Sequence, residues 1–209
     1  MPAPLLRPLS RWAWALLAVT LVWTTPAQAQ FSEGYRFLEA VKKKDGQKVT
    51  DALAEPGSTI VLSRDVTSGE GPLHIVIARR DKAWLEFLIA KGANVNQADF
   101  KGVTPLMLAC NLNFIEGVEV LAGKGAKVDQ SSLTGETPLI AAVHSRNIEL
   151  LRVLLRAGAD PDRADNSGRT ARDYAALDGK SSPLLAAIER EAKPKSAKGT
   201  AKPVFGPSG

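Results

Sequence analysis

The sequence is poor in the residue types from which most catalytic and metal sites are built. Its 209 residues include one cysteine and two histidines, so an intrachain disulfide and a multi-cysteine metal site are both excluded. His74 and His144 stand far apart in the sequence, in no HxxxH or HxH pattern. An enzyme needs a converging nucleophile, base and stabiliser, or ligands at metal spacing. The sequence therefore predicts a protein that is not an enzyme, with no metal and no cofactor; a metal-dependent enzyme accessory using a histidine is the disfavoured alternative.

The single cysteine, Cys110, lies in the apolar run LMLAC. A cysteine in such a run behaves as a small hydrophobic residue when it is buried. We expect burial rather than a reactive thiol.

An excess of positive charge is also missing from most of the chain. The formal net charge is +5, but residues 1–29 hold two arginines and residues 193–209 hold four lysines, with no acid in either segment. Removing these six positive charges leaves −1 for residues 30–192. A nucleic-acid-binding domain carries a basic stripe on the fold itself, so no nucleic-acid partner is expected. The tail at 193–209 is rich in Lys, Pro, Gly and Ser, which predicts disorder; contact of its lysines with an anionic surface is the alternative.

The N-terminus has the layout of a signal peptide. Arg7 and Arg11 precede an uncharged apolar run at 12–23, and Ala27-Gln28-Ala29 forms a small-x-small cleavage site. A helix over this run rises only about 18 Å, less than the ~30 Å hydrocarbon core of a bilayer, so cleavage after Ala29 is favoured over a retained membrane anchor. No second apolar stretch is long enough to span a bilayer. We expect a periplasmic or secreted protein without stable membrane insertion, and the AQA site suits a bacterial periplasm.

What the sequence does contain is an internal repeat of constant period. Pro72, Pro105 and Pro138 follow one another at a constant step of 33 in residue number, and Ala171 continues the series. Three further series keep the same step: they are Gly69, Gly102, Gly135 and Gly168; Gly92, Gly125 and Gly158, each followed by Ala; and Leu88, Leu121 and Leu154. Four series in phase indicate an internal repeat.

Each recurring residue has a physical role in a helix-turn-helix-loop unit. Thr104 and Thr137 can cap a helix N-terminus, with the following proline at the first helical position. A second helix is predicted where Ile148, Leu151 and Leu154 share one face. Glycine in a left-handed conformation ends that helix, and a polar, turn-rich loop follows. One such unit cannot bury its apolar face alone, so the units are expected to stack as a solenoid.

A repeat of this period, with the strings GPLHIV, TPLMLA and TPLIAA, resembles the ankyrin repeat. The resemblance covers about residues 34–192 and implies an all-α solenoid of about five units. We expect a signal peptide at 1–29, an ankyrin domain at 30–192 and a disordered tail at 193–209. The expected unit boundaries are 34–66, 67–99, 100–132, 133–165 and 166–192. The resemblance also implies that His74 ties loop to helix by hydrogen bonds.

The two end units depart from this pattern. In the first, the step from Gly57 to Gly92 is longer than the period, which predicts a small insertion in its loop. In the last, Ala171-Arg172 replaces Pro-Leu, as suits a unit with one face in water. A final helix is expected to begin at Pro183, capped by Ser181 or Ser182, and to run to about Ala192.

The resemblance implies a function in binding an unidentified partner protein on the concave surface formed by loop tips and first helices, with the chain itself a monomer. An envelope or host-directed tether that uses the basic tail is the alternative. Phe100 and Leu133 are apolar residues at predicted loop tips, where exposed apolar groups mark binding sites; packing back onto their own loops is the other interpretation. The candidate partner-binding residues are Phe100, Lys101, Leu133, Thr134, Arg79, Asn111 and His144.

Overall fold

The computed structural model describes residues 27–192 apart from residues 56, 178 and 180, and side chains from residue 33 onward. This part of the chain forms ten α-helices and one 3-10 helix, without strands. The all-α solenoid predicted from the repeat is confirmed. Most of the expected signal peptide and the whole tail at 193–209 lie outside the described residues. Within the described part, no helix is long and apolar enough to cross a membrane.

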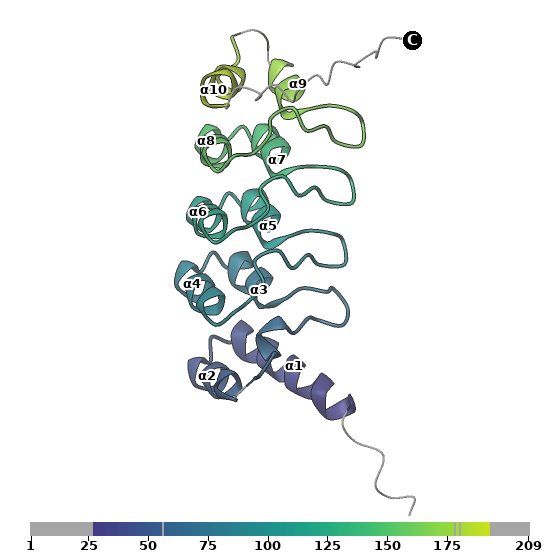
Figure 1. The fold of residues 1–209 in the computed structure, drawn as a ribbon, viewed down its shortest axis with the longest axis vertical. Coiled ribbons are helices and arrows are strands. Elements are labelled where there is room, and N and C mark those ends of the chain that lie inside the picture. The colour runs from purple at the N-terminus through teal and green to yellow at the C-terminus, as the bar shows by residue number, and fades with distance from the viewer. Residues whose placement is uncertain (1–26, 56, 178, 180, 193–209) are drawn as a thin grey trace, which may run out of the picture.

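The helices form two parallel columns, and long loops project from the side of the first column (Figure 1). The first column holds the first helix of each unit and the second column the second helix. The first helices are α1 (Ala27–Lys42), α3 (Pro72–Ala78), α5 (Pro105–Asn111), α7 (Pro138–His144) and α9 (Ala171–Ala176). The second helices are α2 (Gly46–Ala54), α4 (Lys82–Ala90), α6 (Ile115–Gly123), α8 (Ile148–Arg156) and α10 (Pro183–Glu191), and the 3-10 helix η1 spans Ile60–Leu62.

The predicted caps set the helix starts. The hydroxyl of Thr104 accepts from the backbone N–H of Met107 at 3.3 Å, and that of Thr137 from Ile140 at 3.2 Å. Both threonines are buried, so these bonds satisfy donors that water cannot reach. Of the two serines proposed as the cap of the last helix, it is Ser182 whose side chain accepts from the helix, α10.

The second helices end at the glycines that the period identified. Gly92, Gly125 and Gly158 have φ angles of +92°, +83° and +96°, a left-handed conformation that glycine adopts at little cost. The last unit has Gly179 with a φ of +92° between its two helices, whereas the turns between the helices of the first four units contain left-handed residues that are not glycine. These residues are Lys44, Arg80, Asn113 and Arg146.

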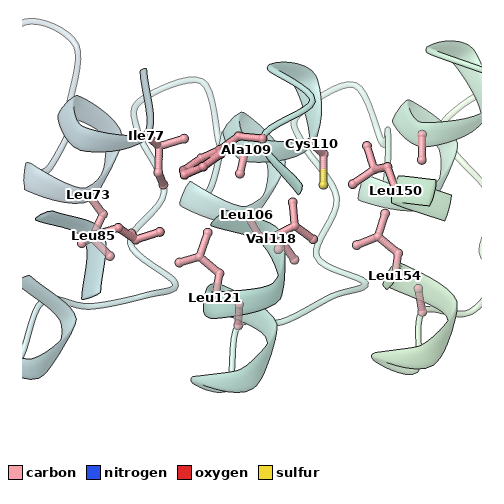
Figure 2. Close-up of a cluster of buried hydrophobic side chains, with 14 of the residues drawn as sticks. Leu73, Ile77, Leu85, Leu106, Ala109, Cys110, Val118, Leu121, Leu150 and Leu154 are labelled. Carbon is pink, nitrogen blue, oxygen red and sulfur yellow. The ribbon is translucent and has the colours of Figure 1, made fainter. Parts of the chain in front are cut away.

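Stacking of the units buries one continuous apolar core (Figure 2). Leu121 and Leu154 of the second helices are fully buried, as are Ala109 and Ala142 of the first. Cys110 is 1% exposed within this core, and burial raises the pKa of its thiol to about 12. The predicted burial of Cys110 is confirmed. Its low reactivity stays a prediction, which the raised pKa of the thiol supports.

His74 ties two successive loops to its helix. Its Nδ1 accepts from the backbone N–H of Gly71 at 3.1 Å, so Nε2 carries the proton and donates to the carbonyl of Val103 at 3.0 Å. The side chain is 2% exposed. The expected structural role is confirmed, and the bond to Val103 also links the unit to its neighbour.

The first unit contains the predicted loop insertion. Its helices α1 and α2 bury Leu38, Val41 and Val49 as expected, while Leu53 is partly buried. The stretch that follows contains the short helix η1, which has no counterpart in the described parts of the later units. The extra residues lengthen the loop but keep α1 and α3 in contact.

Candidate functional site

Four loops share a common hydrogen-bonding pattern, and the loops project beside the first helices (Figure 1). In each, one backbone N–H bonds across the base of a tight turn: Asp99 to Val103 at 2.9 Å, Ser132 to Glu136 at 3.0 Å and Asp165 to Arg169 at 2.9 Å. Asp65 bonds to Glu70 in the same way at 2.8 Å, across a turn one residue longer. These bonds hold the turn residues at the outer tips of the loops.

Apolar side chains occupy the tips of the first three loops. The residue after the first turn residue is Val66, Phe100 and Leu133 in successive loops, with exposed fractions of 68%, 58% and 72%. The fourth loop has Asn166 there, which donates its side-chain amide to the carbonyl of Leu133 at 3.1 Å. We call Val66, Phe100 and Leu133 the apolar ridge.

The glycine of the preceding loop leaves room for the side chain of each of two ridge residues. A Cβ on Gly69 would lie 2.6 Å from the ring of Phe100, and one on Gly102 would lie 3.2 Å from Cγ of Leu133. Phe100 and Leu133 therefore each pack against the preceding loop. More than half of each residue stays exposed, so both remain available to a partner.

A groove of about 350 Å³ opens beside Leu133, between the third and fourth units. Val103, Met107 and Pro138 give it an apolar lining. The other lining residues are Lys101, Asn111, Ser132, Leu133, Thr134, Glu136, Thr137 and Ala141. We call this hollow the inner groove. Four of the seven residues predicted from sequence line it, namely Lys101, Asn111, Leu133 and Thr134.

His144 lies at the border of the inner groove. Its Nδ1 donates to Oε1 of Glu136 at 3.2 Å, and Glu136 lines the groove. The imidazole also packs edge-on against the ring of Tyr174, with centroids 4.6 Å apart and planes at 77°, an arrangement that favours aromatic contact. The predicted candidate is therefore exposed, as expected, and fixed on two sides.

Tyr174 is itself anchored to the fourth loop. Its hydroxyl donates to Oδ2 of Asp165 at 2.7 Å, and the hydroxyl of Ser167 donates to Oδ1 at 2.7 Å. These two hydrogen bonds, with Ser167 the larger contributor, lower the pKa of Asp165 to about 2. A chain of contacts thus runs from the fourth loop to the groove.

Arg79 is held by contacts within the protein. Its guanidinium donates to the carbonyl of Val41 at 2.7 Å, pairs with Asp81 at 3.5 Å and lies 5.5 Å from the ring centroid of Trp84. These contacts join α3 to the end of α1. They favour a structural role, and Arg79 does not line the inner groove or belong to the ridge.

Sequence spacing missed Val66. The glycines Gly69 and Gly102 keep the period of the repeat, which aligns Thr67 with Phe100. The hydrogen bonds align Asp65 with Asp99 instead, because the extra turn residue lies between Asp65 and Gly69. Alignment of the turns on their aspartates would have found it.

A larger hollow of about 940 Å³ lies at the N-terminal end of the stack. It is lined by residues of α1, α2 and η1 and of the loop between α2 and η1, and its charged residues are of both signs. None of the predicted candidates lines it. Size alone does not identify a binding site, and the inner groove is the hollow at which independent features converge. Over the described residues, no group of three or more His, Cys, Asp or Glu is placed to hold a metal ion.

A family model of ankyrin repeats in three copies matches residues 37–132 and 124–194. A comparison with curated proteins finds no match. The matched segments cover more than half of the chain and include every repeat unit that carries the ridge and the groove. Ankyrin repeats are in general modules for protein–protein interaction. By its repeats, its helical stack and this match, the chain belongs to the ankyrin-repeat family.

Proposed function

We propose that this protein is a non-catalytic, exported binding module that holds one partner protein on the surface formed by the inner groove and the apolar ridge. The observation that carries the proposal is the convergence of exposed apolar tips with a hollow lined by four predicted candidates. Exposed apolar clusters with a polar rim are typical of protein interfaces. The groove lies on the side of the solenoid that carries the loops and the first helices. This is the side on which the resemblance to ankyrin repeats predicts that partners bind.

A binding role is also supported by what the candidate catalytic residues do. Both ring nitrogens of His74 form structural hydrogen bonds. His144 is hydrogen-bonded to Glu136 and packs on Tyr174. Cys110 is a buried thiol with a raised pKa. A general base or nucleophile needs access to a substrate, which neither His74 nor Cys110 has.

The binding surface is tested by replacing Phe100 and Leu133 together with Ala. Both side chains are mostly exposed, so the fold should survive while capture of a partner from envelope extracts weakens. Leu177→Ala is a matched control, since Leu177 is 71% exposed but outside the ridge and the groove. Equal capture by the double variant and the control would remove this surface from consideration.

Export to the periplasm or the medium is supported by the sequence of residues 1–29. The mature chain is expected to begin at Gln30, and mass spectrometry of the protein from its native host measures this directly. A chain that retains the apolar run at 12–23 would contradict cleavage and favour an anchored protein.

The alternative is a tether that contacts an anionic polymer through Lys193, Lys195, Lys198 and Lys202. Four lysines without an acid favour such contact at low salt. Deletion of residues 193–209 should then move the protein to the soluble fraction. An unchanged distribution would leave the tail without a tethering role.

A further inference from the structure

The inner groove carries one charged side chain that the protein leaves without a partner. Lys101 lines the groove, and among the described residues its ammonium group has no ion-pair or hydrogen-bond partner. The nearby carboxylate of Asp99 turns into its own loop, where it accepts from the backbone N–H groups of Lys101 and Val103 at 2.8 Å. The other charge of the groove, Glu136, is paired with His144. Of the two charged groups that line the groove, the ammonium group of Lys101 is therefore the one left for a partner to pair with.

The polar rim also offers unused hydrogen bonds. Asn111, at the end of α5, is exposed and lines the groove, and its amide has no partner among the residues that the structure describes. An asparagine side chain provides two donors and an acceptor, which matches the alternating groups of an extended peptide backbone. Thr134 is less available, because its hydroxyl bonds to that of Ser132 at 2.7 Å.

The size of the groove limits what enters it. About 350 Å³ is near the lower end of the range for ligand pockets and suits one large apolar side chain with adjoining backbone. Beyond Leu133, the tips of the two preceding loops also carry exposed apolar side chains, Phe100 and Val66. A small molecule confined to the groove would leave this ridge uncovered, whereas an extended polypeptide would cover both.

We propose that the inner groove and the apolar ridge bind an extended acidic peptide segment of the partner. A large apolar side chain enters the groove, an aspartate or glutamate beside it pairs with Lys101, and Asn111 bonds the peptide backbone. Further apolar side chains of the segment lie over Phe100 and Val66. This inference rests on the proposed function and adds the chemistry of the partner.

The probe is a library of random linear peptides displayed on phage. Peptides enriched on the wild-type protein should carry an acidic residue close to Trp, Phe or Leu. Ala141→Trp, which fills the groove, should abolish their binding. If a thermal melt shows that this variant does not fold, Leu133→Asp at the exposed ridge replaces it.

Charge reversal at Lys101 tests the acidic residue. Lys101→Glu should weaken binding of the enriched peptides about 3- to 10-fold, as reversal of an exposed pair implies, and selection on this variant should favour basic residues. Lys124→Glu is the matched control: it is an exposed lysine of the same unit, outside the groove, and its affinity should equal that of the wild type.

Two results would overturn the inference, and they differ in what they leave standing. Peptides that Ala141→Trp excludes but Lys101→Glu binds normally would show a groove without acidic preference, and the proposed function would stand. Peptides that bind the filled groove unchanged, or no enrichment, would show that the groove is not a peptide site. The double alanine variant at Phe100 and Leu133 would then decide the proposed function on its own.

Discussion

Replacing His74 with Met isolates what the loop-to-helix hydrogen bonds contribute to stability. Met107 occupies the same helix position in the next unit and is 5% exposed, so a methionine fits this environment. The change leaves the buried N–H of Gly71 without its acceptor, which costs about 1–3 kcal/mol, and removes the bond to Val103, worth about 0.5–1.5 kcal/mol. We therefore expect the free energy of unfolding to fall by about 1.5–4.5 kcal/mol.

The measurement is urea unfolding followed by circular dichroism, with amide hydrogen exchange to locate the loss. Exchange should accelerate in α3 and in the loop that ends at Val103, and less in α8, because repeat stability is set mainly by neighbouring interfaces. His144→Met is the control, since an exposed histidine paired with one carboxylate should cost under about 1 kcal/mol. A loss at position 74 no larger than at position 144 would refute this account of His74.

Three further outcomes follow from the core and the fourth loop. Leu154→Ala should lower the free energy of unfolding by about 2–5 kcal/mol in a denaturant melt, because it leaves a cavity at a fully buried site; a loss under about 1 kcal/mol would mean that the units repack freely. Cys110 should not react with a thiol reagent at pH 8 until the protein is unfolded, since its thiol stays protonated below a pKa of about 12; rapid labelling of the native protein would contradict its burial. Asp165 has a pKa of about 2, below the ordinary 3.8, so its stabilising effect is present above pH 3.8 and is lost as the pH falls toward 2. The stability difference between the wild type and Asp165→Asn should shrink over that range in thermal melts, and a constant difference would count against the hydrogen bonds to Asp165.

Most of the fold was predictable because its determinants are local and recur. Thr104 and Thr137 cap helices through their own side chains, and Gly92 ends one through its own backbone freedom, so each acts within a few residues of its place in the sequence. The phase of Leu121 and Leu154 gave the buried face in the same way. Because each of these residues recurs at a constant period, the same helix boundary is indicated several times along the sequence.

The remaining features depend on contacts between units, which spacing does not encode. Arg79 was a surface candidate by register, but the carbonyl of Val41 lies within its reach only once α1 and α3 are stacked. The contact of His144 with Tyr174 joins two units in the same way. Val66 was missed because Gly69 is in phase with the repeat although the turn that contains it is one residue longer than the later turns.

The site was predictable to the extent that residues with a structural role could be recognised and set aside. Once prolines, glycines and buried leucines were assigned to the fold, Lys101, Asn111, Leu133 and Thr134 remained, and the structure brings these four to one groove. Their convergence could not be read from the sequence, because it depends on how far each loop leans over the next first helix.

The stacking of the units has a mechanical consequence. Each first helix packs on that of the next unit, α1 on α3, α3 on α5, α5 on α7 and α7 on α9. A pull on the two ends would therefore be carried by every interface in series, and the weakest interface would set the force at which the array opens. The groove lies across the interface of α5 and α7, so a segment bound there would stabilise that interface against the pull. Tension would then first open an interface that no partner covers.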